Sequence, residues 1–173
     1  KFQHVVINSR AKESLMQRLG LESTVVPNVF DFENPPSNSD DYGDDFRDQF
    51  KIESDEILFL QPTRIVPRKG IELSIELCSR IQKRIKNKIC LVVSHLAGDE
   101  GMEYYHQLVD LSERLGIRVI WAGERIGESR GLNSSGEKLY RLWDVYPHAD
   151  FVTYPSLYEG FGNALLETLT ALL

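Results

Sequence analysis

Two short segments of this sequence carry the residue types that a phosphorylated ligand needs. In the first, four residues separate Arg64 from Lys69, and Gly70 follows at the start of a predicted helix. Basic side chains near a helix N-terminus favour a bound phosphate, because the charge and the free N–H groups act together. Taken alone, this segment could also be a loop with solvated bases.

The second segment runs from Tyr154 to Glu167 and combines glycines with two carboxylates. Gly160 and Gly162 precede a predicted helix, so backbone N–H groups there can approach a diphosphate. Glu159 lies in the loop, and Glu167 lies about one turn inside the helix. A carboxylate accepts hydrogen bonds from neighbouring sugar hydroxyls. The alternative is that Glu159 caps the helix and Glu167 is a surface residue.

Short apolar runs predict the elements that must position these segments. Four runs without alternation, typical of strands buried on both faces, lie at residues 57–60, 89–93, 117–121 and 151–154. Helical spacing is found over residues 70–86, over 105–115 before Gly116, at Leu139, Leu142 and Trp143, and over 163–173. This order predicts an α/β fold with a doubly wound parallel sheet, which binds ligands at the carboxyl ends of its strands.

The first 34 residues have a separate pattern, with strands predicted at 4–7 and 24–26 and a helix at 11–19. Residues 34–43 are rich in Pro, Ser, Asn and Asp, as linkers are. We therefore expect residues 1–34 to be the tail and linker of a preceding domain. Residues 35–173 would form a second domain that is cut short at its C-terminus, because the last predicted helix has no cap.

The composition excludes several classes of protein. With 42% apolar and 27% charged residues, the chain can build a core, so disorder is excluded. The apolar runs are far shorter than the roughly 20 residues of a membrane span, and no secretory leader is seen, which predicts a cytoplasmic protein. Cys78 and Cys90 lie in apolar segments and are predicted as core residues. No spacing of His and Cys indicates a metal site.

The charge is unevenly distributed. The net charge of −6 is evidence against nucleic-acid binding. Residues 31–56 hold ten acidic against two basic side chains, whereas residues 62–88 hold eight basic against two acidic ones. Both segments could be solvated surface, or the basic one could meet an anionic ligand. His95, which follows a predicted strand, could be a ligand contact or proton relay, although a loop histidine bonded to the backbone is the interpretation we prefer.

Taken together, the two segments resemble the retaining glycosyl transferases of the group 1 family. The resemblance rests on R-x4-K-G at 64–70, on P-S-x-Y-E-G-F-G at 155–162, and on the seven residues between Glu159 and Glu167. It extends to residues 26–31, 47–52 and 142–150. The sequence departs from the family at Pro62-Thr63, where Gly usually precedes the arginine, at Val29, and at residues 94–96.

The resemblance implies a GT-B architecture, in which two Rossmann-like domains face a cleft and this chain supplies the C-terminal, donor-binding one. It implies a retaining, metal-independent hexosyltransferase that moves a sugar from a nucleotide-diphosphate sugar to a sugar or glycan-type acceptor. The missing N-terminal domain would hold that acceptor. An alternative is a non-catalytic nucleotide or sugar-nucleotide binding module. A receiver-like signalling domain ranks last, because bases instead of acids follow the first core strand.

The resemblance also implies a role for each site residue. Arg64 and Lys69 would hold the donor diphosphate and replace a metal, Glu159 would contact the donor sugar, and Glu167 would bind the ribose. Backbone contacts or helix amides would come from Gly160, Phe161, Gly162, Asn163, Ala164 and Leu165. The nucleobase would lie along Glu124, Arg125 and Ile126. We expect no further cofactor, and we expect this chain alone to bind a nucleotide without transferring sugar.

Overall fold

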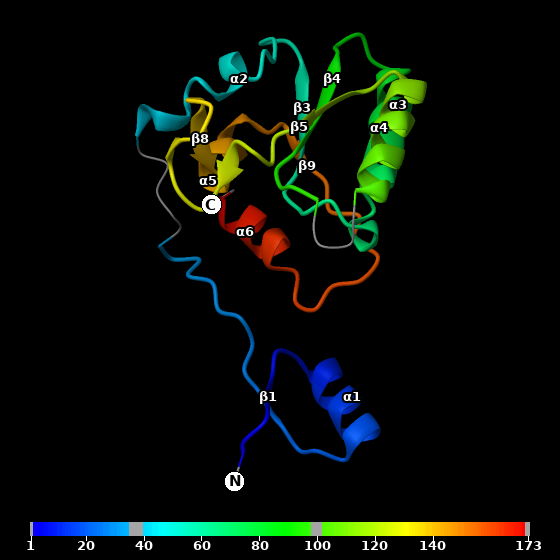
Figure 1. Ribbon diagram of the computed structural model, residues 1–173, viewed down its shortest axis with the longest axis vertical. Helices are drawn as coiled ribbons and strands as arrows, with labels where there is room; N and C mark the ends of the chain where they lie inside the picture. The colour runs from blue at the N-terminus through cyan, green and yellow to red at the C-terminus, as the bar shows by residue number, and fades with distance from the viewer. Residues whose placement is uncertain (1, 35–39, 98–101, 172–173) are drawn as a thin grey trace. The chain divides into compact units, whose positions relative to one another are not determined.

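The computed structural model describes residues 2–34, 40–97 and 102–171 (Figure 1). The chain forms two compact units, of which one comprises Lys1–Pro35 with Tyr158–Leu173 and the other Pro36–Leu157. The first break lies next to the expected end of the linker, whereas the second break was not expected. The assignment of residues 35–173 to one donor-binding domain stays a prediction.

The unit over Pro36–Leu157 is built on a parallel sheet, as predicted. Its strands are β3 (Ile57–Gln61), β4 (Ile89–Val93), β5 (Arg118–Trp121) and β9 (Phe151–Val152), in the order β5-β4-β3-β9. The chain enters at β3, adds β4 and β5 on one side, and then places β9 on the other side. The order therefore reverses between β3 and β9, and such a reversal opens a crevice at the carboxyl ends of the two strands.

Only the two inner strands are buried as the apolar runs predict. Every residue of β4 is buried, and so is β3 from Leu58 onward. The edge strands β5 and β9 are mostly half-buried or exposed in this unit. Strand β9 ends at Val152, two residues earlier than expected, and Pro155 soon follows without an N–H for a sheet hydrogen bond.

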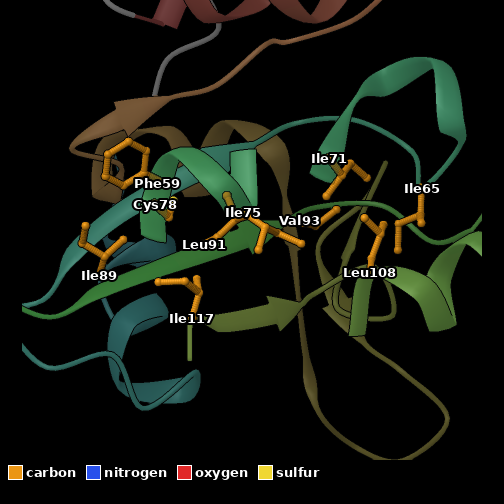
Figure 2. Packing of buried hydrophobic residues seen from close by; sticks show 10 residues of the cluster. All are labelled: Phe59, Ile65, Ile71, Ile75, Cys78, Ile89, Leu91, Val93, Leu108 and Ile117. Atoms are coloured by element: carbon orange, nitrogen blue, oxygen red, sulfur yellow. The ribbon is translucent and has the colours of Figure 1, made fainter. Parts of the chain in front are cut away.

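Helices α3 (Ile71–Gln82) and α4 (Glu103–Leu115) lie together on one side of the sheet (Figure 1). Figure 2 shows how Ile71, Ile75 and Cys78 of α3 point toward the strands. The rest of the labelled core comes from the strands, from α4 and from the connections: Phe59, Ile65, Ile89, Leu91, Val93, Leu108 and Ile117. Gly116 ends α4 with a φ of 66°, a left-handed conformation that glycine adopts without strain.

The chain segment that connects β5 to β9 forms a small sheet that the sequence did not predict. It consists of β6 (Ile126–Gly127), β7 (Gly131–Leu132) and β8 (Lys138–Arg141), and it is followed by α5 (Leu142–Val145) and the 3-10 turn Tyr146–His148. The helix expected from Leu139 onward is therefore wrong in its first part, because Leu139 belongs to β8. The apolar spacing there reflects a strand that runs directly into a four-residue helix.

Ion pairs fasten this small sheet to the acidic segment, which forms the turn Asp41–Gly43 and α2 (Phe46–Gln49). Arg130 bridges Asp40 and the buried Asp144. Lys138 Nζ lies 2.7 Å from a carboxylate oxygen of Asp45. Part of the acidic segment thus neutralises cations of its own unit, which accounts for some of the uneven charge.

The other unit contains β1 (Val5–Val6), α1 (Ser9–Leu19), β2 (Thr24–Val25) and α6 (Asn163–Ala171). Strands β1 and β2 are parallel, and α1 connects them. The elements agree with the predicted ones within a few residues, although residues 172–173 of the expected last helix lie outside the described part of the chain. Over the described residues, no helix has both the length and the apolar character to cross a bilayer.

Candidate functional site

Lys69 lies at the carboxyl end of β3, in a short 3-10 turn (Pro67–Lys69), and its side chain is only 8% exposed. Its ammonium nitrogen lies 5.4 Å from the centre of the Tyr154 ring, which follows β9. The buried side chain of Gln61 donates from Nε2 to the carbonyl oxygen of Lys69 at 3.0 Å. Lys69 is therefore held from both strands that border the crevice, whereas Arg64 is exposed.

The loops after β3 and β9 are packed directly on one another. Gly70 has a φ of 61°, and a Cβ there would lie 2.6 Å from the carbonyl oxygen of Pro155. The amide of Leu157 donates to the carbonyl oxygen of Arg68 at 2.8 Å. The loop that leads to the second motif is thus fixed against the turn that carries Lys69, as far as Leu157.

The N-terminus of α3 differs from the expectation that it would help to bind a phosphate. The amide of Ile71 donates to the hydroxyl of Tyr104 at 3.1 Å, and this hydroxyl also contacts Glu72. Burial and the neighbouring carboxylate raise the pKa of Tyr104, so the hydroxyl stays protonated. The first amide of α3 is therefore occupied by Tyr104 and does not face an anion.

The glycine motif lies in the other compact unit and ends at α6. The side-chain amide of Asn8 donates to the carbonyl oxygen of Gly160. Gly162 has a φ of 93°, and its carbonyl oxygen accepts from the amide of Leu165 at 3.0 Å. The amide of Leu165 is thus engaged within the helix, which leaves Asn163 and Ala164 as the residues whose amides begin it.

The two glutamates of this motif differ in their surroundings. Glu159 is half-buried in the loop, and Glu167 is half-buried on α6. Burial raises the pKa of Glu167, because the charged carboxylate loses hydration. Both carboxylates are in the same compact unit as Gly160 and Gly162, whereas Arg64 and Lys69 are in the other one.

The three residues expected along a nucleobase are not equivalent. Glu124 is exposed. Arg125 donates from Nε to the carbonyl oxygen of Lys138 at 3.1 Å, and its guanidinium lies 4.6 Å from the centre of the Phe50 ring. Ile126 is buried in β6. The side chains of Arg125 and Ile126 therefore support the fold, and any contact with a base would come from their backbone.

Sequence reasoning missed Gln61. Its side chain is fully buried, and Oε1 has no hydrogen-bond partner among the described residues. The signal was present, because Gln61 is a polar residue directly after four apolar ones, at the edge of the sheet where ligands bind. Among the residues placed by the structure, no group of three or more His, Cys, Asp or Glu side chains could hold a metal ion.

Comparison with known proteins identifies the class. The family model "Glycosyl transferases group 1" matches residues 43–173, so this chain belongs to that family. The mannosylglucosylglycerate synthases of Petrotoga mobilis and Thermotoga maritima are 36% and 34% identical to it, over 97% and 98% of this chain. The chain spans 42% and 40% of the lengths of these two relatives.

A solved structure shows the same fold. HepE of Anabaena, solved in complex with UDP-glucose, superposes with a TM-score of 0.72 over 98% of this chain and 42% of that one. Their sequences are 17% identical. The parallel sheet and its Rossmann-like architecture are therefore those of the glycosyltransferase fold that the sequence resembled.

Proposed function

We propose that this chain is the donor-binding part of a retaining hexosyltransferase, which moves a sugar from a nucleotide-diphosphate sugar to a sugar or glycan-type acceptor. The observation that carries the proposal is the reversal of strand order between β3 and β9. Arg64 and Lys69 follow the first of these strands, and Glu159 to Glu167 follow the second. Both motifs thus leave the sheet where an α/β protein binds its ligand.

In this proposal, Arg64 and Lys69 bind the diphosphate. The bond between the anomeric carbon and the diphosphate oxygen breaks, so positive charge develops on the sugar and negative charge on the departing nucleotide. Fixed cations stabilise that negative charge at little reorganisation cost, the more so for Lys69, which is shielded from water. We expect no metal requirement, because these two side chains supply the positive charge.

The acceptor hydroxyl would form the new bond on the face that the diphosphate leaves. It would pass its proton to the leaving phosphate oxygen, which lies on that same face. Glu159 would bind hydroxyls of the donor sugar, with the backbone of Gly160, Phe161 and Gly162 beside it. Glu167 would accept hydrogen bonds from the ribose, and the amides of Asn163 and Ala164 would meet the phosphates.

The acceptor would be held chiefly by a preceding domain, of which residues 1–34 are the tail. Orientation of two reactants can account for about 7–11 kcal/mol of a barrier, so a donor site alone is a poor catalyst. Two comparisons support the assignment of substrates. Two relatives are mannosylglucosylglycerate synthases, and the neighbour HepE was solved with UDP-glucose.

Titration calorimetry of this chain with UDP, GDP and ADP tests the donor site. We expect at least one nucleotide to bind, and Lys69→Ala and Glu167→Ala to weaken that binding. Arg80→Ala is the matched control, because Arg80 is an exposed base on α3, away from the carboxyl edge of the sheet. Wild-type affinity in both site variants would place the pocket elsewhere.

Activity separates the enzyme from the non-catalytic alternative. A protein that joins this chain to the preceding domain is given the donor whose nucleotide binds, together with simple sugar acceptors. Product, or slow hydrolysis of the donor, supports the transferase. Nucleotide binding without either reaction would favour a binding module. Activity that is lost in chelator and restored by magnesium would contradict the metal-independent part of the proposal.

A further inference from the structure

The start of α1 contacts the glycine motif within its own compact unit. Asn8 directly precedes α1, and its side-chain Nδ2 donates to the carbonyl oxygen of Gly160. Arg10, in the first turn of the helix, has the central carbon of its guanidinium 5.5 Å from the centre of the Tyr158 ring. Glu159 lies between the two contacted residues. Two contacts from α1 therefore flank the carboxylate that is proposed to bind the donor sugar.

The donor end of the Asn8 side chain is aimed by its acceptor end. Asn8 is the N-cap of α1, and its Oδ1 accepts from the amide of Ala11 at 2.8 Å. The first amides of a helix have no partner within the helix, so a capping side chain accepts a hydrogen bond there. Because the carboxamide group is planar, the bond at Oδ1 also limits the direction of Nδ2. The cap thus points one hydrogen-bond donor at Gly160.

The backbone at Gly160 needs such a contact to hold one conformation. No side chain restricts Gly160, and apart from its neighbours in the chain, no described atom lies within 4 Å of where a Cβ would be. Gly162, two residues later, has a φ of 93°, which other residues rarely adopt. A segment with two glycines has many accessible conformations. The hydrogen bond from Asn8 favours one of them.

The far end of the motif is held by the same N-terminal segment. Asn28 follows β2, and its Nδ2 donates to Oδ1 of Asn163 at 2.5 Å. Asn163 is the first residue of α6. The glycine motif is therefore tied to residues 1–34 on both sides of its glycines, and Glu159 lies at the end that α1 holds.

A cavity of about 690 Å³ lies beside these contacts. Its walls come from β1, from α1 and from the loop, and they include Asn8, Arg10, Glu159 and Gly160. Close packing fixes a side chain only where neighbouring atoms surround it. Because Glu159 borders open space on this side, its position depends on directed contacts to the loop, such as those from Asn8 and Arg10.

We propose that Asn8 is a positioning residue for Glu159. By holding the carbonyl group of Gly160, Asn8 sets the direction in which the Glu159 carboxylate meets the hydroxyls of the donor sugar. The inference rests on the proposed function, in which Glu159 binds those hydroxyls. Both Oδ1 and Nδ2 of Asn8 are engaged by the protein, so Asn8 acts through the loop.

The test compares nucleotides with their sugar forms by titration calorimetry: UDP with UDP-glucose, and GDP with GDP-mannose. Asn8→Ser is the main variant, because serine caps a helix about as well as asparagine and lacks the amide nitrogen. We expect it to weaken the preferred sugar nucleotide about two- to tenfold, as the loss of one hydrogen bond does, and to leave the parent nucleotide unchanged. Gln17→Ala, at an exposed position on α1, is the matched control and should change neither affinity.

A double variant shows whether Asn8 acts through Glu159. Glu159→Ala alone should weaken the sugar nucleotide. Adding Asn8→Ser should then cause little further loss, because the positioned carboxylate is already absent. Fully additive losses, or an equal loss for the parent nucleotide in Asn8→Ser, would overturn the inference.

Thermal unfolding separates this role from the capping role of the same side chain. The Tm of Asn8→Ser should equal that of the wild type. If it falls, Asn8→Asp takes its place, because aspartate also caps a helix and its carboxylate cannot donate to Gly160. If the wild type binds no nucleotide, the proposed function fails together with this inference. If Glu159→Ala weakens the sugar nucleotide and the Asn8 variants do not, this inference alone fails.

Discussion

Replacing Lys69 by methionine removes a charge and keeps most of the aliphatic side chain. A charge-assisted hydrogen bond contributes about 1.5–3 kcal/mol. Because Lys69 is only 8% exposed, its bond to a phosphate would be shielded from water and should lie near the upper end of this range. With about 1.4 kcal/mol for each factor of ten, Lys69→Met should weaken nucleotide binding by about 100-fold.

Arg64 provides an internal comparison, because it is exposed and its charge is screened by solvent and salt. Arg64→Ala should cost about 1.5 kcal/mol, or about tenfold in affinity. Titration calorimetry at low and high salt measures both effects. The loss in Arg64→Ala should shrink as salt is added, whereas the loss in Lys69→Met should persist. Equal losses with equal salt dependence would refute the argument from burial.

Three further predictions concern other parts of the molecule. Burial raises the pKa of Glu167 above the ordinary 4.5 of a glutamate, so ionisation of this side chain destabilises the folded state as the pH rises above that value. Glu167→Gln should therefore raise the Tm at pH 7 but not at pH 4. Gly123→Ala should cost about 1–3 kcal/mol in urea unfolding, because backbone atoms block its Cβ, whereas Gly127→Ala should be tolerated. Mixed with donors and simple acceptors, this chain alone should release no transfer product; a rate like that of the protein with its preceding domain would contradict the expected acceptor domain.

The sheet could be predicted because its information is local. The apolar runs at β3 and β4 are strands, and Gly116 ends a helix through its own backbone preference. The small sheet of β6, β7 and β8 escaped prediction because distant residues hold it. Tyr42 donates its hydroxyl proton to the carbonyl oxygen of Leu139 at 2.9 Å, and no spacing in the sequence indicates such a pairing.

The residues of the candidate site could be predicted from the sequence, but the contacts that hold them in place could not. The motifs at Arg64, Lys69 and Glu159 could be found from spacing and resemblance alone. The burial of Lys69 depends on Gln61 and Tyr154, which only the folded chain brings to it. The residue roles implied by the resemblance stay predictions until nucleotide binding is measured.

The two core cysteines have a practical consequence for solution studies. Cys78 and Cys90 are fully buried, and burial raises their pKa values to about 12 and about 11. Since the thiolate is the reactive form, both native thiols should resist maleimide reagents while the protein is folded. A single cysteine at the exposed Ser134, in the turn between β7 and β8, would then accept a fluorophore without prior removal of the native thiols. A fluorophore for measurements of ligand binding could therefore be attached to the chain with both native cysteines left in place.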